Sequence, residues 1–508
     1  MIENNIGNIE AFLLALEHET TTGELFLEHQ RVGIAEKPYS VCKFVYSQKY
    51  YFEFCGETLL WKETTPQTII SRMDCWLRSE GGRLQRTLGD SKKDQELSAL
   101  IFKTIKSACR CKHLENVLKM IIPVMTDDSI FSKLDMAHQF LLPIKDVRVI
   151  NLLTGQVRPR SITDYFTWEC PVEPVKHYSE FFLSSISKIM CNNPARIDYL
   201  KKICGYCMTG STEAQSYFVW YGKGGNGKSL ILNLISAMLG KASAPISKGV
   251  VVNCGKKSEA GTEILALRSL RVGTFSETCK LESLNEGVLK TISGGDTLTA
   301  RGLYKDPISF KLYCKLIICT NHKPEFDGSD MGTARRIKLL PFDARFTREV
   351  GKALSPSGVP NPNRFEYSII EGLEAILIEK HLSEFFTWCL EGCRLWAEDK
   401  GFLIIPDSIK EQQNQYIRSQ NSFITWFNES VKPCDNTNPS GKILRSASYS
   451  SYNDFCESEG IKKIPKKDFF EKMTEELSPV VRLNGLHYYK DCCLVEAAPE
   501  EFVRDLDS

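Results

Sequence analysis

The chain has no apolar run long enough to cross a membrane, and its polar start, MIENNIGNIE, does not have the form of a signal peptide. It has almost no net charge, +1 over 508 residues, and neither an internal repeat nor a low-complexity tract. We therefore expect an intracellular protein with no membrane partner. At this length one hydrophobic core is not enough, so three or four domains are predicted.

Nineteen cysteines are present, but they form no regular framework. They are scattered through apolar segments, as at Cys314, which suits reduced thiols in an intracellular compartment better than disulfides. Cys204 and Cys207 have C-x-x-C spacing, yet no second pair stands at the distance that a zinc site needs. We interpret them, and likewise Cys109 and Cys111, as packing residues.

Positive charge is concentrated in the middle of the chain. Residues 201–345 hold 21 Lys and Arg against 12 Asp and Glu, a net charge of +9. A basic segment of this kind fits a polyanionic partner such as nucleic acid, although part of the excess could serve a bound nucleotide. The flanking pattern is β-rich at 41–62, helical at about 68–125, and again β-rich at 140–172.

Residues 216–235, SYFVWYGKGGNGKSLILNLI, carry the most informative pattern. The run 217–221 is typical of a buried parallel strand, and an apolar helix is predicted from 230 to 239. The glycines between them allow a tight loop whose N–H groups surround an anion, and a helix N-terminus favours phosphate there. The spacing is that of a P-loop, which predicts ATP with Mg²⁺ as the bound cofactors. The predicted binding residues are Gly222, Lys223, Gly224, Gly225, Asn226, Gly227, Lys228 and Ser229.

Three further segments add candidate catalytic residues. The weakly apolar strand at 269–277 ends in Glu277, an acid placed to hold Mg²⁺ with Ser229 or to polarise the attacking water. Ser276 stands where many related sites carry a first acid. The buried strand 312–319 is followed by Asn321, whose amide could sense the γ-phosphate or merely cap the turn before Pro324.

Between these strands, residues 301–310 are predicted to form two short strands around a tip at Tyr304, Lys305 and Asp306. A cation beside an aromatic ring suits contact with the phosphates and bases of DNA, although both could be ordinary turn residues. Arg335 and Arg336 follow, at the start of an apolar run. Paired arginines are usually exposed charge, but in a ring-forming ATPase a neighbour's arginine completes the site.

This order of motifs resembles superfamily 3 helicases of viruses and mobile elements, with the poxvirus-type and phage or plasmid primase-helicases as the nearest group. The matching segments are GKGGNGKS (222–229), TFSE (274–277), LKTISGGDTLTARGLY (289–304), KLIICTNHKP (315–324) and ARRIKLLPF (334–342). Weaker similarity extends to LLTGQVRPR (152–160) and to 421–431 and 448–473. Large members carry a primase ahead of this module, and about 130 residues before position 140 would not accommodate one, so a separate primase is expected.

The resemblance implies an α/β fold built on a P-loop AAA+ ATPase core at 201–345. It would follow an uncertain segment, 1–60, and a mixed α+β N-terminal module, 61–200, and precede a helical linker, 346–420, and a winged-helix-like C-terminal region, 421–508. It implies a homohexameric ring that moves 3′ to 5′ on single-stranded or forked DNA beside a separate primase and DNA polymerase, in the cytoplasm or nucleus of a host. By position, the catalytic set is Lys228, Glu277, Asn321, Arg336 (with Arg335 second), and the DNA contacts are Tyr304 and Lys305.

Other classes of protein stay open at this point. A P-loop DNA motor that does not unwind, or an origin-binding or scaffold protein that uses ATP only to assemble, would share most of these motifs. A small-molecule kinase would need a lid and an acceptor pocket that the sequence does not reveal. The segment from Gly294 to the predicted hairpin favours the helicase.

Overall fold

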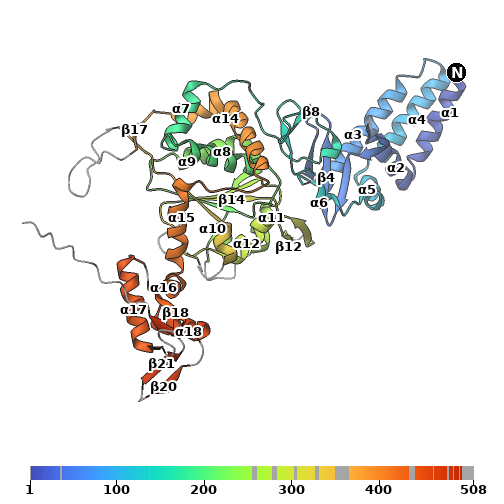
Figure 1. Ribbon diagram of the computed structural model, residues 1–508. Coiled ribbons are helices and arrows are strands. Elements are labelled where there is room, and N and C mark those ends of the chain that lie inside the picture. Colours follow the sequence, from blue (N-terminus) through green and yellow to red (C-terminus); the bar gives the residue numbers. More distant parts are fainter. Residues whose placement is uncertain are drawn as a thin grey trace, which may run out of the picture.

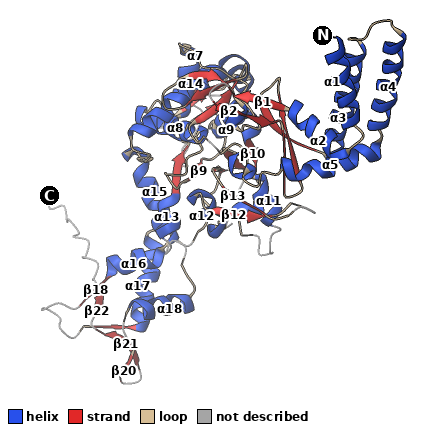
Figure 2. Cartoon of the chain, turned by 90° about the vertical axis from the view of Figure 1, so that its right-hand side faces the viewer, coloured by secondary structure: helices blue, strands red, loops and turns tan. Residues whose placement is uncertain are grey.

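Three lobes follow one another along the chain (Figure 1). The N-terminal lobe extends to residue 172, the central lobe covers 173–420 and the C-terminal lobe covers 421–494. In Figures 1 and 2 the first and last lobes lie on opposite sides of the central lobe. No helix in the described part of the chain is long and apolar enough to span a bilayer. This computed structural model describes residues 2–34, 37–136, 138–253, 260–276, 283–302, 306–326, 331–348, 365–433, 441–461, 463–477, 480–483, 486–490 and 492–494.

The N-terminal lobe combines a layer of helices with three small antiparallel sheets. The apolar faces of its five longer helices form one core. The strands at 44–47, 50–55 and 60–64 pair in one sheet. The elements are α1 (Ile2–Ala15), α2 (Glu19–His29), β1 (Arg31–Ile34), β2 (Lys37–Cys42), β3 (Phe44–Ser47), β4 (Tyr50–Cys55), β5 (Leu60–Thr64), α3 (Pro66–Gln85), α4 (Lys92–Ala108), α5 (Cys111–Met125), α6 (Ile130–Lys133), β6 (Leu141–Ile144), β7 (Arg148–Asn151) and β8 (Val157–Pro159).

A five-stranded parallel sheet forms the middle of the central lobe, in the order β10-β11-β14-β9-β15. The predicted strand at 217–221 is confirmed as β9, buried because strands flank it and helices cover both faces. Since the strands are parallel, their carboxyl ends share one edge, where ligands bind in sheets of this kind. The strands are β9 (Tyr217–Tyr221), β10 (Ser243–Pro245), β11 (Val272–Ser276), β14 (Lys315–Thr320) and β15 (Ile337–Pro341).

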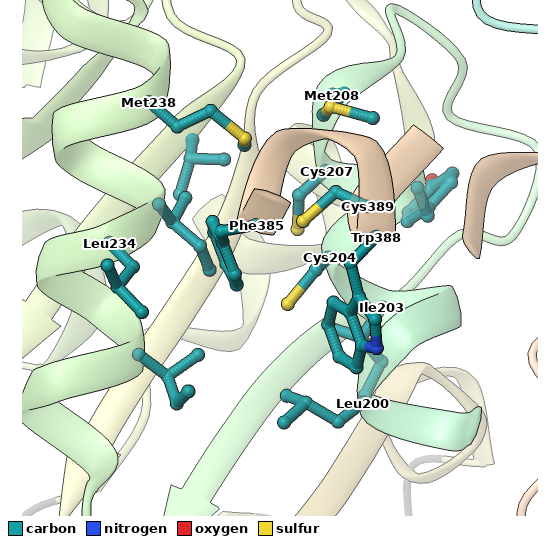
Figure 3. Packing of buried hydrophobic residues seen from close by; sticks show 14 of the residues in the cluster. Leu200, Ile203, Cys204, Cys207, Met208, Leu234, Met238, Phe385, Trp388 and Cys389 are labelled. Carbon is teal, nitrogen blue, oxygen red and sulfur yellow. The ribbon is translucent and has the colours of Figure 1, made fainter. Parts of the chain in front are cut away.

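Helices α8, α9 and α14 cover one face of the sheet and pack closely on one another (Figure 3). A Cβ on Gly205 would lie 2.1 Å from the backbone nitrogen of Cys393, so α8 and α14 cross where a side chain would not fit. Cys204 and Cys207 are fully buried in this core with Cys389 (Figure 3), and burial raises the pKa of both thiols. Both cysteines are members of this apolar core, as the packing interpretation predicted. Among the described residues no group of three or more His, Cys, Asp and Glu is placed to hold a metal ion.

The other elements of the central lobe surround the sheet. The helices are α7 (Glu180–Ile189), α8 (Pro194–Met208), α9 (Lys228–Leu239), α10 (Lys248–Val251), α11 (Ala260–Ala266), α12 (Glu286–Gly294), α13 (Met331–Arg336), α14 (Leu373–Glu398) and α15 (Asp407–Gln420). The added strands are β12 (Thr297–Ala300) with β13 (Ile308–Lys311), an antiparallel pair, and β16 (Arg345–Thr347) with β17 (Glu366–Ser368), a parallel pair.

The predicted hairpin exists, but its first strand was placed wrongly. That strand, β12, ends at Ala300 rather than starting at Arg301, and Ala300 pairs with Ile308. Gly295, at φ +69°, ends α12, and the alternating residues Thr-Leu-Thr-Ala begin the strand almost at once. The tip between the strands is therefore longer than predicted.

The C-terminal lobe has its own small core, built on helices and a three-stranded antiparallel sheet in the order β19-β21-β20. Helix α15 of the central lobe leads into this lobe, which lies apart from the N-terminal lobe (Figures 1 and 2). Its elements are α16 (Ser422–Ser430), β18 (Val431–Pro433), β19 (Lys442–Leu444), α17 (Arg445–Ser458), α18 (Lys466–Glu476), β20 (Val481–Leu483), β21 (Leu486–Lys490) and β22 (Cys492–Leu494).

A buried group of charges joins the N-terminal and central lobes below the sheet. Asp135 accepts hydrogen bonds from Thr167 N and Oγ1 at 2.8 and 2.6 Å, and burial raises its pKa to about 6. Arg271 and Lys315 are both only 2% exposed, and Lys315 N donates to Arg271 O at 2.8 Å where β11 and β14 begin. Burial lowers the pKa of Arg271 to about 10 and that of Lys315 to about 7. Asp135 attracts Arg271, whereas Arg271 and Lys315 repel each other, so the burial of the two cations costs stability.

Candidate nucleotide site

The loop after β9 has a backbone that glycine alone adopts without strain. Gly224, Gly225 and Gly227 have φ values of +95°, +59° and +88°. At Gly222 the constraint is close approach, since a Cβ there would lie 2.6 Å from the carbonyl oxygen of Phe342. The loop runs into α9, whose first turn has no side-chain cap, so its N–H groups stay open to an anion.

Lys228, the first residue of α9, lies inside this loop rather than in solvent. Its Nζ donates to Gly222 O at 2.6 Å, to Asn226 Oδ1 at 3.1 Å and to Asn321 Oδ1 at 3.2 Å. The side chain is 6% exposed, and desolvation lowers the pKa of the ammonium group. Asn226 is fixed in turn by donating from Nδ2 to Phe342 O at 3.0 Å. The cation is held by neutral oxygens where phosphate oxygens would also reach it.

A pocket of about 470 Å³ opens beside the loop. The loop from Gly224 to Ser229 forms one wall, so Ser229 lines the pocket directly beside Lys228. The ends of two neighbouring strands form the floor, with Ser276 from β11 and Cys319, Thr320 and Asn321 from β14. The structure thus brings six of the eight predicted loop residues, Gly224 to Ser229, together with Asn321 around one pocket at the carboxyl ends of the strands.

The third wall of the pocket is apolar, and the sequence reading missed it. Ile369 and Ile370 line the pocket although they are 41% and 37% exposed, and α14 begins beside them. This wall is tied to the phosphate loop, because Phe346 N in β16 donates to Gly225 O at 2.8 Å and β16 pairs with β17. The sequence signal for this wall was the pair of isoleucines that precede Gly372. Gly372 has a φ of +68° and stands directly before α14.

The candidate arginines lie at the opposite end of the sheet, where its parallel strands begin. Arg335 and Arg336 end α13, just before β15, whose first residue pairs with Tyr217 at the start of β9. Arg336 Nη1 donates to Gly332 O at 2.8 Å, and desolvation lowers its pKa. Five residues of strand, about 16 Å, separate this edge from the phosphate loop, so neither arginine reaches the pocket of its own chain.

Three predicted site residues lie outside the described residues. Glu277 directly follows Ser276, the last residue of β11. Tyr304 and Lys305 stand between β12 and β13 in the sequence, and the structure describes the chain up to Gly302 and again from Asp306. Asp306 Oδ1 forms an ion pair with Lys49 Nζ at 2.9 Å, so the hairpin is anchored to the N-terminal lobe.

Residues 220–336 match a family of unknown function, DUF5906. "Putative helicase L207/L206" of Acanthamoeba polyphaga mimivirus is 32% identical over 166 residues, which are 32% of this chain and 17% of that protein. "Putative helicase 184R" of Invertebrate iridescent virus 6 is 28% identical over 236 residues, 43% of this chain and 24% of that protein. "Putative primase C962R" of African swine fever virus (strain Badajoz 1971 Vero-adapted) is 26% identical over 178 residues, 35% and 18% of the two chains.

These alignments span less than a quarter of each relative's length. Among solved structures, the apo NrS-1 C terminal region (305-718) is 12% identical, with 68% of this chain and 82% of that chain covered and a TM-score of 0.41. A JCV helicase with a bound acetamide compound is 11% identical, with 50% and 64% covered and a TM-score of 0.26.

Proposed function

We propose that the chain is an ATP-dependent DNA helicase of superfamily 3 that serves the replication of a large DNA virus or mobile element. The observation that carries this proposal is the contact of Lys228 with Asn321 at the open edge of a parallel sheet. This contact supports a shared role for the loop lysine and a polar side chain of the adjacent strand at one phosphate of the nucleotide. The viral relatives that are named helicases and primases support the assignment.

The pocket supports ATP with Mg²⁺ as the substrate. Lys228 and the N–H groups of the loop would hold the β- and γ-phosphates, and Ser229 would hold the metal. The metal neutralises charge on the phosphates during transfer to water. Glu277, following the strand end at Ser276, would activate that water, and Asn321 would sense the γ-phosphate. The strand order β10-β11-β14-β9-β15 supports an AAA+ core, because β14 separates the P-loop strand from the strand that precedes the acid.

The position of the arginines supports a ring of identical subunits. Arg336, the preferred finger, and Arg335 lie at the far edge of the sheet, so either would serve only the site of a neighbouring subunit. A head-to-tail ring gives every subunit one finger to donate and one to receive. We propose a homohexamer around one DNA strand that moves 3′ to 5′, with Tyr304 and Lys305 contacting the strand. A separate primase and DNA polymerase would complete the replication machinery.

The test uses the purified chain with forked DNA that carries either a 3′ or a 5′ single-stranded tail. We expect DNA to stimulate ATP hydrolysis by the wild type, and we expect the wild type to unwind the 3′-tailed fork. The Lys228→Ala variant should neither hydrolyse ATP nor unwind the fork. Stimulated hydrolysis without strand separation would point instead to a motor that does not unwind. ATP-dependent oligomers with negligible turnover would point to an assembly or origin-binding protein.

A further inference from the structure

One acidic side chain lines the nucleotide pocket without a part in the hydrolysis proposed above. Of the described residues around the pocket, Glu374 alone is acidic, and it is the second residue of α14. In the sequence it closely follows the apolar wall that begins with Ile369 and Ile370. A carboxylate repels phosphate, so Glu374 is unsuited to the part of the pocket around Lys228 and suits another part of a bound nucleotide.

The carboxylate of Glu374 is held by the helix that follows the phosphate loop. Asn233 Nδ2 donates to Glu374 Oε1 at 2.9 Å. Asn233 is four residues after Ser229, so it lies on the same face of α9, roughly 6 Å further from the loop along the helix axis. The other carboxylate oxygen, Oε2, forms no hydrogen bond or ion pair with any residue in the described part of the chain. One oxygen is therefore available to a ligand in the pocket.

Glu374 stands where two walls of the pocket meet. Through Asn233 it is tied to the helix of the phosphate loop, and along α14 it is joined to the apolar wall. In a nucleoside triphosphate the ribose lies between the phosphates and the base. If the phosphates occupy the loop and the base covers Ile369 and Ile370, the ribose falls at this junction. Its hydroxyl groups are donors, and a carboxylate oxygen accepts hydrogen bonds from them.

We propose that Glu374 accepts hydrogen bonds from the ribose hydroxyls of the bound nucleotide and makes the site selective for nucleotides that carry them. The inference rests on the proposed function, since it needs a nucleotide in this pocket. A carboxylate binds the ribose in dinucleotide-binding folds as well, where the phosphates also lie at a helix N-terminus. A site built around a hydroxyl group discriminates against an analogue that lacks it, because the acceptor is left unpaired.

The experiment measures binding of nucleoside diphosphates to the full chain by calorimetry with Mg²⁺, so that no hydrolysis occurs during the titration. We expect the wild type to bind ADP about tenfold more tightly than 2′,3′-dideoxy-ADP, which lacks both hydroxyls. Glu374→Ala should bind ADP about tenfold more weakly than the wild type, and should bind the two nucleotides equally. Asn233→Ala should lower the preference about threefold, because the carboxylate is no longer held in one rotamer.

The matched control is Glu371→Ala, which removes an acid from the same segment of the chain. Glu371 is exposed, forms an ion pair with Arg348 at 2.9 Å and does not line the pocket. This variant should bind ADP and dideoxy-ADP as the wild type does. An acid in the first turn also stabilises a helix, but that effect does not depend on the sugar of the nucleotide. The preference for ADP therefore separates a ribose contact from a purely structural role of Glu374.

Equal binding of ADP and dideoxy-ADP by the wild type would overturn the proposal, as would an unchanged preference in Glu374→Ala. Inosine diphosphate has a carbonyl in place of the adenine amino group. A loss in Glu374→Ala that appears with ADP but not with inosine diphosphate would assign the carboxylate to the base and overturn the ribose contact. If the wild type binds no nucleotide, the helicase function fails as well. If it hydrolyses ATP and unwinds forks without preferring the hydroxyls, the ribose contact alone is refuted.

Discussion

Lys228 Nζ and Asn321 Oδ1 lie 3.2 Å apart, joining the phosphate loop to the end of the neighbouring strand. The two residues are 93 positions apart in the sequence, and the pairing of β9 with β14 brings them together. If ATP binds as proposed, the ammonium would exchange the neutral oxygen of Asn321 for a charged phosphate oxygen and would free the Asn321 amide. The contact thus offers a way to couple nucleotide binding to the adjacent strand.

We therefore expect Lys228→Ala to impair both ATP binding and hydrolysis, and Asn321→Ala to impair hydrolysis alone. Lys228→Ala should lose ATP binding and turnover together, because the charge that faces the phosphates is gone. Asn321→Ala should bind ATP within about threefold of the wild type but hydrolyse it about 10²-fold more slowly, since its amide acts on the chemical step. Equilibrium binding of a fluorescent ATP analogue and steady-state hydrolysis check both. Wild-type turnover by Asn321→Ala would remove it from the catalytic set.

The position of Arg336 predicts complementation between two inactive variants. Arg336→Ala should bind ATP but not hydrolyse it, because its pocket receives no finger from the next subunit. Mixed with Lys228→Ala, it should regain activity where a Lys228→Ala subunit lends its arginine to an intact pocket. Hydrolysis is measured in mixed oligomers whose composition is verified by mass. Arg335→Ala serves as the comparison and should be the milder variant. Failure to regain activity in proven mixtures would argue against a finger acting between subunits.

The apolar wall of the pocket predicts a variant that affects affinity alone. Ile369→Ala/Ile370→Ala removes the exposed apolar surface that a nucleotide base would cover, and leaves the phosphate loop intact. We expect KM for ATP to rise about tenfold while kcat changes less than about twofold, as for loss of uniform binding. The exposed Leu183, which does not line the pocket, provides the control Leu183→Ala. A fall in kcat with KM unchanged would show that the wall serves another purpose.

The sequence predicted the phosphate loop and β9 because both depend on local patterns: glycine spacing, a short apolar run and a following helix. Asn321 was predicted for a similar reason, as the polar residue after a buried strand. The apolar wall could not be predicted in this way, because it depends on β16 pairing with β17 and on the hydrogen bond from Phe346 to Gly225.

The structure also differs from the prediction in the hairpin and in a group of buried charges. The first strand of the hairpin was predicted from Arg301, whereas β12 begins at Thr297, directly after the chain turns at Gly295 and α12 ends. The buried charges Asp135, Arg271 and Lys315 gave no local signal at all. A charged residue is expected at the surface, and tertiary packing buries these three. Arg271 lies beside Trp168 of the N-terminal lobe, and Lys315 lies beside Tyr206 of α8.

The hairpin tip predicts a variant that separates hydrolysis from movement on DNA. Lys305→Ala removes one cation that would contact DNA phosphates, so basal hydrolysis and oligomer formation should persist. Stimulation of ATP hydrolysis by DNA and unwinding should be lost. For single-strand binding, the slope of log affinity against log salt concentration should become less steep by about 0.7. Lys311→Ala, an exposed lysine on β13, is the matched control. Unwinding of a 3′-tailed fork at the wild-type rate by Lys305→Ala would mean that DNA takes another path.

Lys315 predicts that stability rises with pH just above neutrality. Burial lowers its pKa to about 7 in the folded chain, and the ordinary value of 10.5 applies when the chain is unfolded. Between these values the unfolded state binds the extra proton, so raising the pH stabilises the folded state by up to about 1.4 kcal/mol per pH unit. Below pH 7 both states are protonated, and the folded protein carries the full cost of a buried charge close to Arg271.

The window from about pH 7 to 8.5 isolates this effect, because the other perturbed groups nearby titrate outside it. Asp135, with its pKa raised to about 6, favours the folded state at acid pH, and the buried thiol of Cys314 matters only near pH 9 and above. Lys315→Met keeps the length of the side chain and removes the charge, so its melting temperature should vary less with pH than that of the wild type. Lys311→Met, at an exposed position, should keep the wild-type slope. Parallel melting profiles for the wild type and Lys315→Met would show that Lys315 stays charged in the folded chain throughout this range.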